Sequence, residues 1–100
     1  MEIKTTVNGT EMTVALEGRL DTTTAPELEK ELETKLDNID ILILEFEKLQ
    51  YISSAGLRVL LGTQKKMNAK KGSMVIKHLN EMIMEVFEMT GFIDILNIEN

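Results

Sequence analysis

The chain has 100 residues, of which 43% are hydrophobic, 28% charged and 4% aromatic. This is the composition of a globular domain with a modest core, so we do not expect a disordered chain. The absence of cysteine excludes disulfide frameworks, thiolate metal sites and cysteine nucleophiles. The net charge of -6 and the scarcity of aromatic side chains disfavour direct binding to nucleic acid.

The amino terminus carries no targeting signal that we can recognise. It is polar and alternating from the first residues, without a basic region followed by an apolar run. No apolar stretch approaches the roughly 18 residues that a spanning helix needs. We therefore expect a cytoplasmic protein that does not insert into a membrane, with a monomer as the default state.

Two extended segments open the chain. Residues 11–18 alternate in hydrophobicity, with Met12, Val14 and Leu16 on one side, which is the period of a half-buried strand. Residues 2–7 alternate more weakly. The Asn-Gly-Thr-Glu sequence between them favours a tight hairpin, because Asn-Gly tolerates positive φ. We predict an antiparallel pair of strands.

A helix and a central strand follow. The segment 21–38 has a stripe of Ala25 and three leucines spaced by three or four residues. Thr24 and Glu27 have the spacing of a capping box, and Pro26 fits the first helical turn. Residues 39–46 are then a nearly continuous run of Ile and Leu, typical of a central strand covered on both faces.

The second half of the chain repeats this alternation. We predict a helix that begins at Ser53 and Ser54 and stops at Gly72, and then a strand over residues 73–79. Asn80 caps a helix over residues 81–90 that ends at Gly91, and residues 92–98 are a last extended segment. The order β-β-α-β-α-β-α-β predicts a single α/β domain over residues 1–100. Its sheet is mixed but mostly parallel, with helices packed against it.

The serine pair precedes the second helix, at the end of a strand. In α/β sheets, functional sites lie at the carboxyl ends of strands, beside helix N-termini that favour an anion. One serine is explained by helix capping alone, because serine is a preferred N-cap residue. That explanation leaves the other serine without a role.

A serine hydrolase is a second interpretation of the pair. The sequence Ser-Ser-Ala-Gly lacks the G-x-S-x-G elbow, and the one histidine, His78, falls in a predicted strand. No feature of the sequence brings His78 within hydrogen-bond reach of Ser54, as a nucleophile and its base require. We therefore expect no enzymatic activity.

A phosphoacceptor is the third interpretation. A hydroxyl at an exposed helix N-terminus can take a phosphate, which adds about -1.5 to -2 charge at neutral pH. The helix dipole favours such a charge by about 0.3–1 kcal/mol, so the fold tolerates it. What changes is the surface that a partner meets.

Three segments resemble the STAS domains of anti-sigma factor antagonists, in order and over nearly the whole chain. They are GRLDTTTAPEL (18–28), LEFEKLQYISSAGLRVLLG (44–62) and VFEMTGFIDILNI (86–98). The family has an apolar residue followed by Asp-Ser-Ser/Thr-Gly-Leu, and the first hydroxyl of that run is phosphorylated. Aligning Gly56 and Leu57 with its Gly-Leu makes Ser54 the phosphoacceptor, with Ser53 as the alternative.

The sequence departs from the family pattern at two positions. Ser53 stands where many members have aspartate, and Ala55 replaces the second hydroxyl. The family's aspartate after the second strand is kept as Asp21, which could equally be a turn residue before the first helix. The resemblance, together with the expected outward direction of Arg58, gives a candidate partner surface. It comprises Asp21, Thr22, Thr23, Ser53, Ser54, Gly56 and Arg58.

The resemblance implies a partner-switching regulator of transcription and no enzyme. The unphosphorylated protein would bind an anti-sigma factor that is a serine kinase, and so free a sigma factor. Phosphorylation of Ser54 would end that interaction, and a serine phosphatase would restore it. The domain would need no cofactor or metal, because ATP and magnesium belong to the kinase.

The sequence leaves two other functions open. A STAS domain can also be a scaffold or a subunit that regulates a transporter, because function resides in the site rather than the fold. A small serine hydrolase that uses Ser54 is the alternative from the enzyme class.

Overall fold

A computed structural model describes residues 1–99, and Asn100 lies outside the described part. Its elements follow the predicted order of strands and helices, with one additional short 3₁₀ helix, so the predicted α/β fold class is confirmed. The elements are β1 (Glu2–Asn8), β2 (Glu11–Leu20), α1 (Ala25–Lys35), β3 (Ile41–Ile52), α2 (Ser54–Ala69), β4 (Ser73–Lys77), α3 (Glu81–Thr90), η1 (Phe92–Asp94) and β5 (Ile98–Glu99).

The five strands form one mixed sheet in the order β1-β2-β3-β4-β5. β1 and β2 are antiparallel, and the other neighbouring strands are parallel. The predicted hairpin is confirmed: Asn8 pairs with Glu11, and Gly9 takes the positive φ of 65° that the tight turn requires. This register puts Met12, Val14 and Leu16 on the same buried face.

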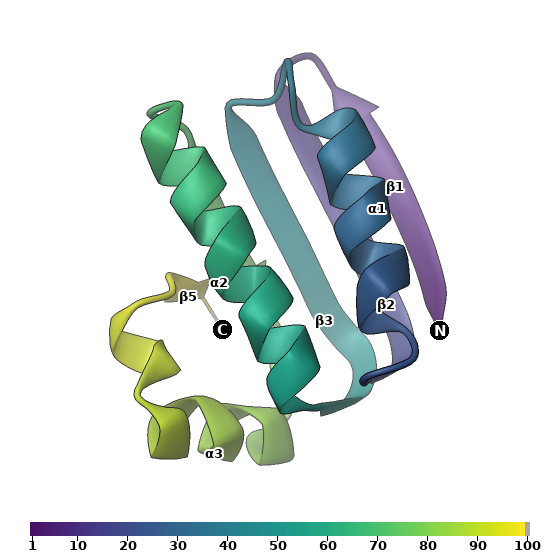
Figure 1. Ribbon diagram of the computed structural model, residues 1–100, viewed down its shortest axis with the longest axis vertical. Helices are drawn as coiled ribbons and strands as arrows, with labels where there is room; N and C mark the ends of the chain where they lie inside the picture. Colours follow the sequence, from purple (N-terminus) through teal and green to yellow (C-terminus); the bar gives the residue numbers. More distant parts are fainter. Residues whose placement is uncertain (100) are drawn as a thin grey trace.

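α1 and α2 lie side by side over one face of the sheet (Figure 1). The core fills the space beneath them, and several of its largest side chains are fully buried: Phe46, Phe87, Met12, Leu16, Leu28, Leu60 and Met67. α3 lies near the end of the molecule where α2 begins (Figure 1), and Asn80 at its start donates to the Leu49 carbonyl of β3 at 3.1 Å. The two long helices, α1 and α2, therefore form one layer over a single face of the sheet (Figure 1).

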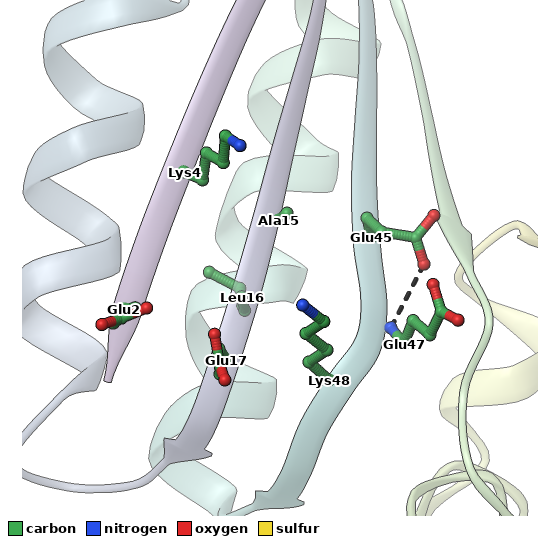
Figure 2. Close-up of a pocket in the computed structure, with 8 residues that line it drawn as sticks. All are labelled: Glu2, Lys4, Ala15, Leu16, Glu17, Glu45, Glu47 and Lys48. Carbon is green, nitrogen blue, oxygen red and sulfur yellow. Dashed lines mark hydrogen bonds between the residues drawn. The ribbon is translucent and has the colours of Figure 1, made fainter.

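The expectation that the central strand is covered on both faces is wrong. Along β3, Leu42, Leu44 and Phe46 are fully buried beneath the helices, whereas Ile41 is 39% exposed and Glu45 is half-buried. Figure 2 views the opposite side, where charged side chains of β1, β2 and β3 project outward and the two long helices lie behind the strands. The apolar run predicted the centre of the sheet correctly, but it could not tell a two-layer fold from a three-layer one.

The predicted extended segment 92–98 is also wrong over most of its length. Gly91 adopts a left-handed conformation with φ 79°, and residues Phe92–Asp94 then form a 3₁₀ turn. Leu96 is buried in the core, and Ile98 and Glu99 pair with the end of β4. A short apolar run is ambiguous between strand and turn, and here the burial of Leu96 decides it.

Two helix ends have the predicted residues. The Asn80 side chain accepts a hydrogen bond from the Ile83 N–H at 2.8 Å, which confirms it as the cap of α3. Gly91 ends α3 in the left-handed conformation, which confirms the predicted glycine stop.

Two other helix ends differ from the prediction. The capping box of α1 does not form, because the Thr24 hydroxyl accepts from the Asp21 N–H and donates to the Arg19 carbonyl, both at 2.8 Å. At the end of α2, the left-handed residue is Lys71, with φ 61°. Gly72 is required for space, because a Cβ there would lie 2.8 Å from the Asp40 carbonyl oxygen.

Gly56 lets the first turn of α2 approach the end of β2 closely. A Cβ at this position would lie 2.7 Å from Leu20 Cγ and 2.9 Å from Ile52 Cγ1, both buried side chains. Gly62, two turns later in the same helix, has no such neighbour within 4 Å. Replacing each glycine by alanine therefore separates two effects: both changes raise helix propensity, but only the change at Gly56 disturbs core packing.

We expect Gly62→Ala to raise the free energy of unfolding by about 0.5–1 kcal/mol, the gain in helix propensity. Gly56→Ala should lower it by about 1 kcal/mol or more, because overpacking a core costs about 1–3 kcal/mol and outweighs that gain. Urea unfolding followed by circular dichroism measures both. An equal gain in the two variants would show that α2 does not pack tightly on Leu20.

Glu31 ties α1 to the edge strand β1. Its carboxylate accepts hydrogen bonds from the Lys35 ammonium and from the Thr5 hydroxyl of β1, each at 2.7 Å. The Lys35 hydrogen bond, followed by that of Thr5, lowers the pKa of Glu31 below its ordinary value of 4.5.

Because the folded state lowers this pKa, the stability that Glu31 contributes should be complete above pH 4.5 and fall as the pH passes through the folded pKa. Urea unfolding between about pH 3 and pH 6 should therefore show a shallower loss of stability in Glu31→Gln than in the wild type. Glu29→Gln, on the same helix, is the control. An acid dependence in Glu31→Gln as steep as that of the wild type would contradict this role.

Candidate functional site

The carboxyl ends of β2 and β3 meet at one edge of the sheet. Leu20 and Ile52 are register partners at the ends of these parallel strands. The N–H of Ser53 donates to the Leu20 carbonyl oxygen at 2.9 Å. The turn that contains Asp21, Thr22 and Thr23 therefore lies beside the start of α2, at the lower end of Figure 1.

Ser54 is exposed and is the first residue of α2. The first main-chain hydrogen bond of the helix joins the Leu57 N–H to the Ser53 carbonyl, so the N–H groups of residues 54–56 precede the hydrogen-bonded turn. No acidic residue stands in this turn to balance the positive end of the dipole. The Ser54 side chain is therefore open from solvent to an electrophilic group of a partner, and the helix terminus beside it favours an added anion.

Ser53 has the opposite environment. It occupies the N-cap position with φ -103° and ψ 176°, but its side chain makes no capping hydrogen bond. Its Oγ is buried and has no hydrogen-bond partner among the described residues. The capping explanation thus fits the position of Ser53 and not its side chain, and the hydroxyl that solvent can reach belongs to Ser54.

Asp21 organises the neighbouring turn. Its Oδ1 accepts the N–H groups of Thr23 and Thr24 at 3.0 and 3.2 Å, and the Thr23 hydroxyl at 2.8 Å. The hydrogen bond from the Thr23 hydroxyl is the main cause that lowers the pKa of Asp21, so this carboxylate stays charged. Asp21 is therefore a turn residue, and the same turn holds it beside the start of α2.

The other predicted surface residues differ in exposure. Thr22 and Thr23 are exposed on the turn, and Arg58 is exposed on α2. Within residues 1–99, Arg58 has no hydrogen-bond or ion-pair partner. Gly56 is buried against Leu20, so it shapes this edge by its lack of a side chain.

Arg19 and Tyr51 adjoin this edge and were missed in the sequence. They are register partners near the ends of β2 and β3, and the Arg19 guanidinium lies 4.2 Å from the centre of the Tyr51 ring. Arg19 Nε also lies 3.8 Å from Asp21 Oδ2. The register shifts twice along β2, between Ala15 and Glu17 and between Gly18 and Arg19. No pattern in the sequence predicts these shifts, so this pairing could not be foreseen.

His78 is hydrogen-bonded to a glutamate and not to Ser53 or Ser54. Its Nδ1 lies 2.8 and 2.9 Å from the two carboxylate oxygens of Glu45, in the middle of β3. Neither serine has a histidine partner within the described residues, so the arrangement lacks the base that a serine nucleophile needs. This geometry gives no support to a hydrolase.

The side chains of Glu45, Glu47 and His78 also form the one group of metal-ligand types that converges within the described residues. Their ligand atoms lie within 4.8 Å of one another. A shallow cavity of about 200 Å³ next to Glu45 and Glu47 opens on the helix-free face of the sheet (Figure 2), and no residue of the candidate surface lines it. The group therefore lies apart from the serine edge, and its geometry alone assigns no metal.

Within residues 1–99, no helix has both the length and the apolar character that crossing a membrane requires.

Comparison with known proteins adds independent evidence of family. A STAS domain family model matches residues 2–100. A protein inferred to be an anti-sigma factor antagonist, BtrV of Bordetella bronchiseptica, is 37% identical over 86 residues, which are 85% of this chain and 74% of BtrV. The anti-sigma-B factor antagonist of Staphylococcus aureus is 30% identical over 99 residues, which are 98% of this chain and 92% of that protein. These names describe regulators, in agreement with the expectation that this chain is not an enzyme.

Solved structures share the fold at lower identity. The unphosphorylated anti-sigma factor antagonist SpoIIAA superposes with a TM-score of 0.79 at 18% identity, over 99% of this chain and 88% of SpoIIAA. SpoIIAA of Bacillus in its phosphorylated form gives 0.78 at 19% identity, over 99% and 92%. A sulfate transporter family protein from Wolinella succinogenes gives 0.79 at 16% identity, over 92% and 75%. The fold is thus common to regulators and transporters, but the sequence match separates them: this chain belongs to the STAS domain family, among the anti-sigma factor antagonists.

Proposed function

We propose that this protein is a partner-switching regulator whose switch is Ser54. The unphosphorylated form binds an anti-sigma factor that is also a serine kinase, and it thereby frees a sigma factor for RNA polymerase. Phosphorylation of Ser54 ends that interaction, and a serine phosphatase restores it. The observation that carries this proposal is the exposed hydroxyl of Ser54 at the N-terminus of α2.

The chemistry of the switch is a phosphoryl transfer between two proteins. The Ser54 oxygen attacks the γ-phosphorus of ATP held by the kinase, and its proton passes to a base of the kinase. The bond between the γ-phosphorus and the β-phosphate oxygen breaks, and ADP leaves. In the phosphatase, water attacks the same phosphorus, the bond to the Ser54 oxygen breaks, that oxygen regains a proton, and inorganic phosphate leaves. ATP and magnesium belong to the enzymes, so this domain needs no cofactor of its own.

The scaffold can accept this modification without unfolding. The phosphate adds about -1.5 to -2 charge at a helix terminus whose dipole favours an anion. Ser54 is exposed, so the new group displaces no core side chain. The modification therefore acts mainly on partner binding, because the surface of this domain that the partner contacts gains a negative charge and the water that solvates it.

The proposed partner surface surrounds this hydroxyl. Ser54 and Arg58 offer exposed side chains from α2, and Thr22 and Thr23 offer them from the neighbouring turn. Asp21 fixes the turn and keeps its charge, while Ser53 and Gly56 hold α2 against Leu20. Ser53 is the weaker phosphoacceptor of the two serines, because its Oγ is buried. We place the protein in the cytoplasm as a monomer, without direct contact to nucleic acid.

A scaffold or a transporter-regulating subunit is the second candidate, because a sulfate transporter family protein superposes with the same TM-score, 0.79, as unphosphorylated SpoIIAA. The sequence matches favour the first candidate: BtrV, at 37% identity, is inferred to be an anti-sigma factor antagonist, and the Staphylococcus aureus protein, at 30% identity, is named as one. A partner pull-down from the native cell that recovers an anti-sigma factor kinase distinguishes them.

Incubation with the anti-sigma factor kinase of its own cell and ATP should add one phosphate, at Ser54. Ser54→Ala should abolish this labelling and change the free energy of unfolding by less than about 1 kcal/mol, the value of a helix cap. Mass spectrometry maps the phosphate. If Ser54→Ala were still phosphorylated, the phosphoacceptor would be a residue other than Ser54.

Ser53→Ala should leave the labelling of Ser54 intact and should not destabilise the fold. An ordinary N-cap serine loses about 1 kcal/mol on such a change. The Oγ of Ser53 is instead buried without a partner, which itself costs about 1–3 kcal/mol, so removing it should leave stability equal or higher. Chemical denaturation tests this expectation. A loss of 1 kcal/mol or more would indicate a capping bond in solution.

Ser54→Asp should weaken binding to the anti-sigma factor without unfolding the domain. Ser73→Asp is the matched control, because it adds the same charge at an exposed serine that begins β4. Isothermal titration calorimetry compares the two variants with the wild type. Equal affinity of Ser54→Asp and wild type would contradict the part of the mechanism that depends on charge.

A further inference from the structure

Ser54 and Arg58 lie one helical turn apart on the same face of α2. Positions four apart in a helix are neighbours, and helical side chains lean toward the N-terminus. By this geometry, the long side chain of Arg58 can reach the turn that begins at Ser54. Both residues are exposed, and Arg58 has no ion-pair or hydrogen-bond partner within residues 1–99.

The order of the two residues suits an anion followed by a cation. A negative group placed four residues before a positive one is the more favourable arrangement, because it also agrees with the helix dipole. A phosphate on Ser54 would bring about two negative charges and three acceptor oxygens to this position. The planar guanidinium of arginine presents paired N–H donors that match a phosphate in a bidentate manner.

Other cations near this edge are less suited to this role. Arg58 is the only charged residue between Ser54 and Gln64. Arg19, at the adjoining strand ends, already lies over Tyr51 and near Asp21. Lys66, three turns along α2, pairs with Glu33 of α1 at 3.8 Å. Arg58 is thus free to receive a phosphate when it is added.

We propose that Arg58 is the intramolecular phosphate clamp of the phosphorylated state. This inference rests on the proposed phosphorylation of Ser54 and deepens it. In the unphosphorylated protein, the Arg58 cation is open to the partner. Once Ser54 carries a phosphate, the guanidinium folds back onto it, so one modification adds negative charge and withdraws a positive contact. The two changes act in the same direction on a partner that recognises Arg58.

The test installs phosphoserine at position 54 during translation, so that no kinase is needed. Phosphorus NMR titration then measures the second pKa of the phosphate, which is about 6 for free phosphoserine. In the wild-type background this pKa should be lower than in Arg58→Gln by about 0.3 unit, the size expected for an exposed pair four residues apart. Lys65→Gln, also on α2 and exposed, is the matched control and should leave the value unchanged.

Further arms distinguish the clamp from general electrostatics. Arg58→Lys keeps the positive charge but loses the paired N–H donors of the guanidinium. It should therefore retain only part of the lowering of the phosphate pKa. High salt should reduce the shift, because the pair is exposed. An identical phosphate pKa in wild type and Arg58→Gln, or an equal rise in Lys65→Gln, would overturn the clamp. Since the phosphate is installed without a kinase, this result is independent of whether a kinase modifies Ser54.

Discussion

The close contact between the first turn of α2 and the end of β2 determines the geometry of the candidate surface. The Ser53 N–H donates to the Leu20 carbonyl at 2.9 Å, and Gly56 permits the Leu20 side chain to pack directly against the helix. This contact turns the Ser53 hydroxyl inward and leaves Ser54 at the surface. It also joins two turns that are more than 30 residues apart in the chain.

A switch on this surface works through charge on a rigid support. α2 is packed along its length on the sheet, and Asp21 holds the neighbouring turn through hydrogen bonds to Thr23 and Thr24. A phosphate at the helix terminus is accommodated by the dipole and, in our proposal, by Arg58. The folded domain then stays the same while the surface presented to a partner changes. The modification can therefore be reversed without refolding the protein.

The fold itself was largely predictable, because its signals are local. Alternating residues predicted β2, helical spacing predicted α1, and Asn80 and Gly91 bound α3 as their chemistry suggests. The errors fall where distant segments decide the conformation. Residues 92–98 turn because Leu96 enters the core, and Gly72 is needed because Asp40 of another loop approaches it. One face of the sheet likewise stays open because α3 packs near the end of the molecule where α2 begins and does not cover that face.

The sequence by itself determined the order of the elements, the family and the serine pair, because composition, periodicity and a motif are written in consecutive residues. Tertiary structure alone decided which serine is reachable, since Ser53 and Ser54 have the same chemistry and differ only in burial. It also decided that Arg19 lies over Tyr51, which depends on a shift in strand register. Such pairings depend on three-dimensional packing between strands, and no local pattern encodes them.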